Sequence, residues 1–542
     1  MDQDKLIGYV YAVTGARTTV VLNDEIDVLT RNYKGEVYPI GQIGSYVSIL
    51  EGAVEVIGMV FQIKITQMAD KADENEEVAL PPDKKVLEVQ LLGTLRDGAF
   101  QRGVSVYPNV KTPVYMTDKD DLDRIFSQYR AHDFSIGEIA VFSGKRAYLD
   151  PNGLFSKHIA VLGSTGSGKS CTVASLIQKA TALEHPHIII FDLHNEYSAA
   201  FPDANCLHTP NIEIPYWLMN FEELQSVFVD QTEITAHNQI MVFREQVIAS
   251  KREQNPELAD VITVDTPAYF EMQTVYDKVV ALDREMVGGA RGDKQGPFYG
   301  KLTRFALRLE SKLQDNRYAF IFKPQKHTSS TTLVALLDQF LGTSAGAKLT
   351  ILDLSGTPSD VRDAIVSLLA RTIFDFNFWN EHRRDFPILV VFEEAHSYLP
   401  QTIDSTFRAS KKAVERIARE GRKYGVSAMV VSQRPSEVSE TVVSQCNNFV
   451  NLRLTNPTDQ AYVKKLVPDA LSNLIDVLPS LRQGEALFIG DAVVMPSRVL
   501  VDLPNPRPNS ADIPFFDKWK KPDEETEIAE VVKNWWFQRK AG

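Results

Sequence analysis

Short apolar segments separated by turn signals characterise the first 150 residues. They are rich in Val, Ile and Tyr, as in "LIGYVYAVTGARTTVVLND" and "KVLEVQLLGTL", which is typical of β-strands. A charged stretch with two prolines at 67–85 interrupts them and is predicted to be an exposed loop. Residues 1–150 are therefore predicted to form a small β-barrel or sandwich domain.

From about residue 157 the pattern changes to apolar runs with helical stretches between them. Continuous rather than alternating hydrophobicity indicates parallel strands covered on both faces. Five such runs occupy 158–163, 187–192, 349–354, 387–394 and 426–433. We therefore predict an α/β fold, with a doubly wound parallel sheet formed by residues 151–204 and 346–503.

The stretch between the second and third of these runs has mostly helical periodicity, which predicts a helical insertion over 205–345. Its helices are joined by a flexible loop at 288–301 that carries Arg291, Lys294 and Lys301. A Pro-rich linker opens the last segment, 504–542, and a helical run follows it. The apolar stripe of that run needs a partner surface and comprises Ile528, Val531, Val532, Trp535 and Trp536.

The bulk composition is that of a folded globular protein. The 542 residues are 44% hydrophobic and 24% charged, which argues against disorder. A net charge of −13 speaks against a protein that coats nucleic acid with its whole surface, although a local basic channel stays possible. The three cysteines are far apart and fit a reducing compartment, and neither a signal sequence nor a membrane-spanning run is found. We therefore expect a cytoplasmic protein that is not embedded in a membrane.

A glycine-rich stretch directly follows the first of the apolar runs. Gly163, Gly168, Lys169 and Ser170 match G-x-x-x-x-G-K-[ST] between a strand and a plausible helix. Backbone N–H groups of such a loop face nucleotide phosphates, Lys169 would reach the β and γ oxygens, and the Ser170 hydroxyl would ligate Mg²⁺. The predicted nucleotide-binding residues are Gly163, Ser164, Thr165, Gly166, Ser167, Gly168, Lys169, Ser170 and Cys171.

Hydrolysis also needs carboxylates that hold Mg²⁺ and polarise the attacking water. "PILVVFEEAH" is an apolar strand that ends in Glu393 and Glu394, which we assign to the metal side and to the general base, respectively. Gln433 ends another strand at the same edge, where it could sense the γ-phosphate or orient water. "FDLHNEY" places Asp192, Asn195 and Glu196 at a third strand end, where they could equally cap the next helix.

A basic helix, "STFRASKKAVERIAREGRKYG", precedes the strand that ends at Gln433. Its cations recur at three- and four-residue spacings and so share one face, which in most proteins is simply a solvated face. A sharper hypothesis is that Arg422 or Arg419 reaches the γ-phosphate bound by a neighbouring subunit. The ten histidines form no metal-ligand spacing.

Together these motifs resemble one family, the HerA-like hexameric ATPases related to the FtsK DNA translocases. The resemblance rests on "KHIAVLGSTGSGKS", "FDLHNEY", "VVFEEAHSYLP", "IAREGRKYGV" and "VVSQRPSEV" in this order, and it covers nearly the whole chain. The N-terminal β-rich segment looks like the HAS-barrel of the family, and "GEALFIGDAVVMPSRV" looks like its closing strands. The chain departs from the family pattern in reading "DLHNEY" and in having Lys157 where arginine is frequent.

The resemblance implies a RecA-like ATPase core in a homohexameric ring, with ATP and Mg²⁺ between subunits and double-stranded DNA in the central channel. It carries over Lys169 and Ser170 as phosphate and Mg²⁺ residues, Glu393 and Glu394 as the acidic pair, Gln433 as the sensor, and Arg422 or Arg419 as the arginine acting in trans. It further implies a partner, either a nuclease or a sirtuin-like NADase of an antiphage system, and a tail helix that braces a neighbour.

Two other functions remain open at this point. The chain could be an assembly scaffold whose ATP state gates a partner nuclease or NADase through the barrel face, without translocation. It could also be a protein-remodelling ATPase, for which Phe298 and Tyr299 would be pore aromatics.

Overall fold

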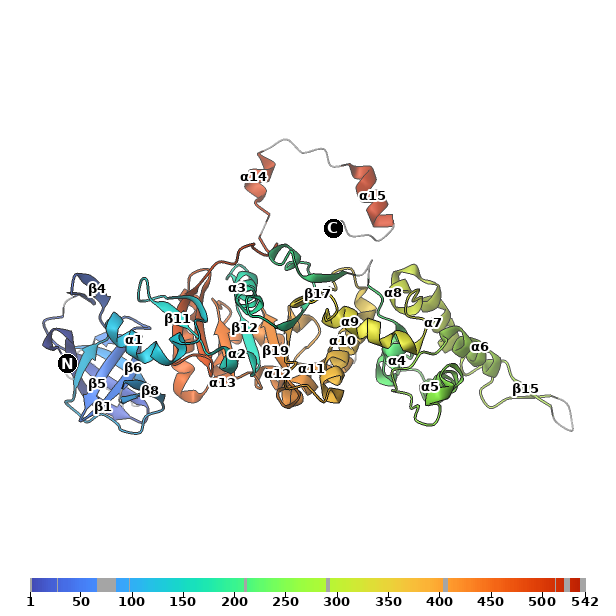
Figure 1. Ribbon diagram of the computed structural model, residues 1–542, viewed down its shortest axis with the longest axis horizontal. Coiled ribbons are helices and arrows are strands. Elements are labelled where there is room, and N and C mark those ends of the chain that lie inside the picture. The colour runs from blue at the N-terminus through green and yellow to red at the C-terminus, as the bar shows by residue number, and fades with distance from the viewer. Residues whose placement is uncertain are drawn as a thin grey trace. The chain divides into compact units, whose positions relative to one another are not determined.

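The computed structural model describes residues 2–26, 28–65, 84–96, 98–208, 212–288, 293–402, 408–511, 513–520 and 527–536 (Figure 1). Nearly all of the predicted loop at 67–85 lies outside these ranges. The chain forms two compact units. Unit 1 comprises Met1–Ala182, Met429–Val438 and Val443–Arg507, and unit 2 comprises Leu183–Ala428, Ser439–Val442 and Pro508–Gly542.

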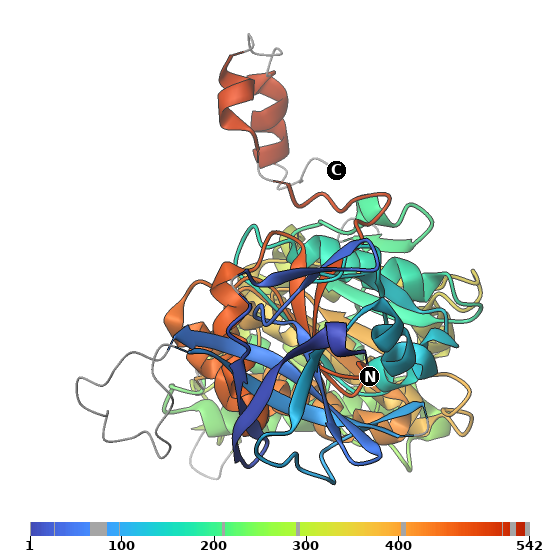
Figure 2. The same cartoon turned by 90° about the vertical axis from the view of Figure 1, so that its left-hand side faces the viewer.

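The N-terminal part of unit 1 is a closed antiparallel barrel, which confirms the predicted β-barrel (Figure 2). Its strand order is β2-β1-β9-β5-β6-β7-β8, and pairing of β2 with β7 closes six strands into a ring. These strands are β1 (Leu6–Thr14), β2 (Arg17–Leu22), β5 (Tyr46–Glu51), β6 (Val54–Ile65), β7 (Lys85–Arg96), β8 (Ala99–Arg102) and β9 (Pro113–Met116). A separate hairpin joins β3 (Thr30–Tyr33) and β4 (Glu36–Pro39).

Apolar residues of these strands form a buried core. The side chains that are buried almost completely are Ile7, Val10, Val20, Val47, Ile49, Val56, Ile57, Val60, Val86, Leu87, Val89 and Val114. Gly8 allows the close approach of β1 to β2, because a Cβ atom there would lie 2.2 Å from the Val21 carbonyl oxygen. Helix α1 (Lys119–Arg130) follows β9 and begins with a capping box formed by Asp118 and Asp121.

Unit 1 also contains one part of the α/β core. Its strand order is β11-β10-β22-β21-β20-β12-β19. The strands are β10 (Ser135–Ile139), β11 (Arg146–Tyr148), β12 (Ile159–Leu162), β19 (Val426–Ser432), β20 (Asn448–Asn451), β21 (Glu485–Gly490) and β22 (Ser497–Val501); the first three residues of β19 belong to unit 2. Strand β12 runs parallel to β19 and β20, whereas β21, β22, β10 and β11 continue the sheet in antiparallel fashion.

The helices of this part of the core are α2 (Pro151–Phe155), α3 (Lys169–Thr181) and α13 (Pro457–Leu466), whereas most of α12 (Glu440–Val443) belongs to unit 2. The sheet is therefore mixed rather than purely parallel. Strands β10 and β11 fall inside the range 1–150 predicted for the barrel, yet they pair in this second sheet. A hairpin partner and a register cannot be deduced from short apolar runs, since alternation shows only that one face is buried.

Unit 2 holds four parallel strands in the order β18-β13-β17-β14. They are β13 (His187–Asp192), β14 (Asn205–His208), β17 (Leu349–Asp353) and β18 (Ile388–Phe392). Helices α10 (Ser359–Trp379) and α11 (Arg408–Glu420) pack on each other. The predicted P-loop type of α/β architecture is thus confirmed, with one apolar run of the sequence for each of β12, β13, β17, β18 and β19.

The segment between β14 and β17 is mainly helical (Figure 1). Its helices are α4 (Phe221–Phe228), α5 (Ala236–Gln254), α6 (Met272–Asp283), α7 (Thr303–Gln314), α8 (Ala319–Phe322) and α9 (Leu333–Leu341). A hairpin of β15 (Met286–Val287) and β16 (Lys294–Gln295) follows α6. A chain of aromatic contacts links Phe221, Phe228, Phe243, Phe305 and Phe322 into a core of its own.

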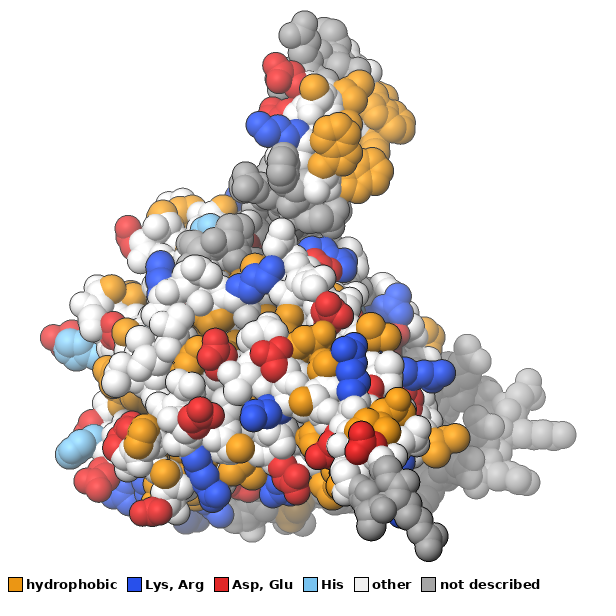
Figure 3. All heavy atoms as spheres, turned by 90° about the vertical axis from the view of Figure 1, so that its right-hand side faces the viewer, with side chains coloured by type: hydrophobic (Ala, Val, Ile, Leu, Met, Phe, Trp, Pro, Cys, Tyr) orange, Lys and Arg blue, Asp and Glu red, His pale blue; other side chains and the backbone are white. Residues whose placement is uncertain are grey.

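The end of the chain carries α14 (Phe515–Trp519) and α15 (Ile528–Trp536). Hydrophobic side chains gather along one side of α15 (Figure 3), and Ile528, Val531, Trp535 and Trp536 are all exposed. The predicted apolar stripe is therefore present on the surface of this helix. Within the described ranges, no helix combines the length and the apolarity that crossing a membrane requires.

Candidate functional site

The glycine-rich stretch forms a tight turn between β12 and α3 in unit 1. Gly166 and Gly168 have φ values of +72° and +97°, a region that glycine enters without the steric cost of a Cβ atom. A Cβ atom on Gly163 would lie 2.7 Å from the Ser167 hydroxyl oxygen and 2.8 Å from the Leu452 side chain. All three glycines are thus required by the shape of the turn.

Backbone hydrogen bonds fix this turn to neighbouring segments of unit 1. The Gly163 N–H donates to the carbonyl of Ser432 at 3.2 Å, and the Ser164 N–H donates to the carbonyl of Arg453 at 2.9 Å. On the other side, the Gly484 N–H donates to the Ser167 carbonyl at 2.9 Å. The turn is therefore held from both sides, a form of preorganisation that phosphate binding benefits from.

The first turn of α3 faces the centre of this loop and fits an anionic group. Gly168 precedes the helix without any side-chain cap, and no acidic residue occupies the first turn. Lys169 is only 7% exposed, Ser170 and Cys171 are partly exposed, and the buried Ser167 hydroxyl has no hydrogen-bond partner among the described residues. Uncapped amides, a lysine and hydroxyl donors suit the phosphates of a nucleotide.

Gln433 lies beside this loop at the end of β19. The Thr165 hydroxyl donates a 2.5 Å hydrogen bond to the Gln433 side-chain carbonyl. The structure thus brings together two of the predicted site residues that are 268 positions apart in the chain.

The predicted acidic pair directly follows β18 in unit 2. Glu393 is 1% exposed, and its carboxylate accepts a 2.8 Å hydrogen bond from the phenol of Tyr197. The phenol of Tyr398 donates to the backbone carbonyl of Glu393 at 2.9 Å. Both tyrosines are fully buried, and burial together with the nearby Glu393 raises the pKa of each well above its ordinary value. Sequence reasoning missed both tyrosines, because nothing in their spacing distinguishes them from core residues.

Glu394 differs from its neighbour in backbone conformation. Its φ of +48° is left-handed, a strained arrangement for a residue with a side chain. The Glu394 carboxylate lies 3.2 Å from Nδ1 of His396. Such strain is found where a side chain must point in a direction that regular backbone would not give it.

The "FDLHNEY" segment leaves β13 in unit 2. Asp192 is fully buried and accepts hydrogen bonds from the N–H groups of His194 at 3.1 Å and Tyr197 at 3.0 Å. Burial raises the pKa of Asp192 above its ordinary value. Asn195 has a φ of +57°, and its side-chain oxygen accepts from the Ser198 hydroxyl. In the described structure Asp192 therefore organises the loop that carries Tyr197.

The two candidate arginines lie in unit 2, at and beyond the end of α11. Arg419 is largely exposed, and its guanidinium lies 3.4 Å from the Glu415 carboxylate on the same helix. Arg422 is exposed and pairs with no acidic side chain among the described residues. Arg422 is therefore the freer of the two to contact another molecule.

Other cations of the basic helix are engaged within unit 2. Lys412 pairs with Glu222 at 2.6 Å, and the Arg416 guanidinium lies 3.1 Å from Asp375 and 4.2 Å from the centre of the Phe374 ring. Side-chain contacts of Arg408 lie outside the described residues. Lys412 and Arg416 thus have structural roles on the helix surface.

The predicted basic loop at 288–301 begins directly after β15 and contains β16, the second strand of the hairpin. Lys294 is exposed in β16, and the Lys301 ammonium donates to the carbonyl of Pro297 at 2.7 Å. Arg291 lies outside the described residues.

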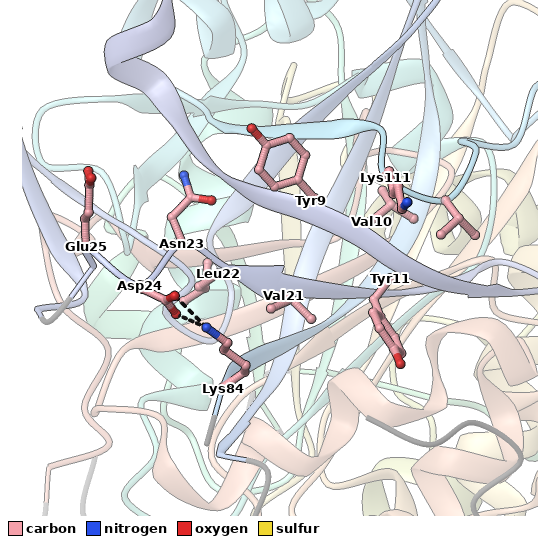
Figure 4. A pocket seen from close by; sticks show the side chains of 11 residues that line it. Tyr9, Val10, Tyr11, Val21, Leu22, Asn23, Asp24, Glu25, Lys84 and Lys111 are labelled. Carbon is pink, nitrogen blue, oxygen red and sulfur yellow. Dashed lines mark hydrogen bonds and ion pairs between the residues drawn. The ribbon is translucent and has the colours of Figure 1, made fainter. Parts of the chain in front are cut away.

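A cavity of about 500 Å³ opens on the barrel, and its lining, as far as the structure is described, contains none of the predicted nucleotide-site residues (Figure 4). Tyr9, Tyr11, Val110 and Lys111 contribute to its wall, and Lys84 forms an ion pair with Asp24 at its side. This cavity is a feature of the barrel surface.

Comparisons with known proteins match most of this chain. The family described as "Helicase HerA, central domain" matches residues 134–373. A DNA double-strand break repair helicase HerA from Sulfolobus acidocaldarius is 31% identical over 446 residues, which cover 81% of this chain and 82% of that protein. A probable helicase from Methanocaldococcus jannaschii is 27% identical over 96% of this chain and 95% of its own length. Among solved structures, VirB4 of Thermoanaerobacter pseudethanolicus aligns with a TM-score of 0.48 at 14% identity, over 70% of this chain and 97% of that one.

Proposed function

Because this chain belongs to the HerA helicase family and is a P-loop ATPase, we propose that it is an ATP-driven ring motor that translocates double-stranded DNA. The observation that carries the proposal is the loop Gly163–Gly168 with the uncapped start of α3 behind it. The names of the relatives, repair helicases and probable helicases, supply the DNA substrate.

The residues of the loop suit ATP and Mg²⁺. We assign Lys169 to the β- and γ-phosphates, and Ser170 with Glu393 to the metal ion. As far as the chain is described, no group of three or more His, Cys, Asp or Glu side chains could by itself hold a metal ion. A magnesium ion that takes most of its ligands from phosphate oxygens and water fits this finding. Bound MgATP supplies the electrophilic phosphorus atom and the charge that draws water toward it.

The remaining chemistry falls to side chains of this chain. Glu394 accepts the proton of the attacking water, since it is the carboxylate that the left-handed backbone turns away from the course of the strand. Gln433, whose side-chain carbonyl accepts a hydrogen bond from Thr165, senses the γ-phosphate or orients the attacking water. Arg422 supplies positive charge to the site of an adjacent subunit, with Arg419 as the alternative residue for this role.

The proposed assembly is a homohexamer with DNA in its channel. The exposed Arg422 and the exposed apolar side of α15 are both surfaces that a second subunit could cover. We further propose a nuclease or sirtuin-like effector on the barrel face, in DNA processing or antiphage defence.

The test is ATP hydrolysis by the purified protein with and without double-stranded DNA. We expect DNA to stimulate hydrolysis, and salt to weaken DNA binding steeply, because phosphate contacts release counterions. Lys169→Ala should abolish nucleotide binding, and Glu394→Gln should retain binding but lose hydrolysis. Glu253→Gln, an exposed change on α5, is the matched control and should hydrolyse ATP at the wild-type rate. Hydrolysis that is indifferent to DNA, together with no DNA binding at low salt, would refute the motor.

The second candidate is an ATP-gated scaffold that regulates a nuclease or NADase without translocation. The net charge of −13 favours protein partners over a surface that coats nucleic acid. In this case Glu394→Gln should change the activity of the effector in an assembled complex, and wild-type protein should not displace another protein that is bound to the DNA as a roadblock. If the roadblock is displaced, and only when ATP is hydrolysed, the protein is a motor.

A further inference from the structure

Two fully buried tyrosines of unit 2 donate hydrogen bonds to the same glutamate, but to different parts of it. The Tyr197 phenol donates to the carboxylate oxygen Oε2 of Glu393 at 2.8 Å, whereas the Tyr398 phenol donates to its backbone carbonyl at 2.9 Å. Only the first of these bonds acts on the group that can ligate a metal ion. The second holds the main chain at the end of β18.

We propose that Tyr197 is a positioning residue that orients the Glu393 carboxylate for Mg²⁺. This inference rests on the proposed function, in which Glu393 lies on the metal side of the ATP site. A hydrogen bond from a neutral donor to an ionised carboxylate is strong where water is excluded, and Glu393 is 1% exposed.

Tyr197 is itself held in place from β13. Its N–H donates to the Asp192 carboxylate at 3.0 Å, and β13 pairs with β18 up to Phe191 and Phe392. The ends of two adjacent parallel strands are thereby tied together through side chains. Two segments that the sequence presents separately, "FDLHNEY" and "VVFEEAH", so form one positioning unit around Glu393.

Removal of a single oxygen tests the proposal. Tyr197→Phe keeps the buried ring and removes the phenol hydrogen bond to the Glu393 carboxylate. Tyr398→Phe removes the phenol hydrogen bond to the Glu393 backbone carbonyl and is the matched control. Supporting groups of metal ligands typically change metal affinity by about 10–100-fold when they are removed. We therefore expect the Mg²⁺ concentration for half-maximal binding of a fluorescent non-hydrolysable ATP analogue to rise by about tenfold or more in Tyr197→Phe. Tyr398→Phe should leave this concentration unchanged.

Three further measurements keep the result interpretable. Binding of the analogue in EDTA should be equal in both variants and wild type, because the phosphate loop is untouched. In a Glu393→Gln background, Tyr197→Phe should have no additional effect on the Mg²⁺ dependence. If Tyr197→Phe proves unstable, the double variant Tyr197→Phe/Glu393→Gln is compared with Glu393→Gln alone at a temperature where both are folded. A difference in Mg²⁺ dependence between these two proteins refutes the proposal.

Equal shifts in both tyrosine variants, or none in either, would overturn the role of Tyr197. Failure of the proposed function looks different, since hydrolysis by the wild-type protein would then be indifferent to DNA and no DNA would bind at low salt, whereas the Mg²⁺ dependence of analogue binding is measured without DNA.

Discussion

A methyl group added at Gly168 should weaken nucleotide binding more than the same group at Gly166. Both glycines have left-handed φ values, +97° and +72°, so alanine at either position costs about 1–2 kcal/mol of backbone strain. The surroundings differ, because a Cβ atom on Gly166 meets nothing within 4 Å. On Gly168 it would lie 2.9 Å from the backbone nitrogen of Gly484 and 3.1 Å from its Cα atom.

The contact with Gly484 adds to the strain of Gly168→Ala, because the new methyl group meets backbone atoms, which cannot move aside by a change of side-chain rotamer. Moving Gly484 lengthens its hydrogen bond to the Ser167 carbonyl, which is 2.9 Å, and such a bond contributes about 1 kcal/mol. The total for Gly168→Ala is then about 2–3 kcal/mol, or a rise in Kd of about 30–150-fold. Strain alone predicts a rise of about 5–30-fold for Gly166→Ala.

Equilibrium titration of a fluorescent ATP analogue in excess Mg²⁺ measures both constants. The melting temperature of each variant, compared with wild type, shows whether the fold is retained. If Gly168→Ala binds as tightly as Gly166→Ala, then Gly484 does not buttress the loop. If both bind like the wild type, the left-handed turn is not the conformation that binds the nucleotide.

Three further predictions concern unit 2. Arg371→Ala should lower the free energy of unfolding by about 3–5 kcal/mol, measured by denaturant titration, because it leaves the fully buried Glu223 carboxylate without the cation that lies 2.9 Å away. Burial lowers the pKa of Lys251 to about 8 from an ordinary 10.5, so the unfolded chain binds more protons at this group between these values; the free energy of unfolding of the wild type should therefore rise relative to that of Lys251→Met from pH 8 to 10.5. Arg422→Ala should lower kcat with ATP affinity retained, whereas Arg419→Ala, whose guanidinium pairs on its own helix, should change kcat little; the opposite ranking assigns the role in trans to Arg419.

The parts of the fold that could be predicted from sequence are those with a local signal. Continuous apolar runs located the central strands, and the glycine spacing located the loop before α3, since both patterns lie within a dozen residues. Strand β20 was not predicted, because its four residues "NFVN" contain only two apolar side chains and it is recognised only by its pairing with β12 and β21. Strands β21 and β22 were expected only from the family resemblance, and their antiparallel direction was not predicted.

The supports of the candidate site were beyond sequence reasoning for a different reason. Residue 163 must be glycine because the Leu452 side chain occupies the space of a Cβ atom there, Gly168 rests against Gly484, and each of these contacts joins positions about 300 residues apart. A motif identifies the group that does the chemistry, because its spacing is set by local backbone geometry. The residues that support such a group come from any segment that the fold places next to it, so their positions in the sequence follow no local pattern.

The tyrosines illustrate how this limit affects function. Glu393 and Glu394 are adjacent and chemically identical in the sequence, so their roles are assigned there by position after the strand and not by any difference in chemistry. In the structure one carboxylate is fixed by a buried phenol, and the other belongs to a residue in left-handed conformation beside His396. A carboxylate with a fixed orientation suits a metal ion, which needs constant geometry, whereas a base must approach and release a proton. This contrast in environment gives a physical reason, independent of any relative, for assigning the metal side to Glu393 and the base to Glu394.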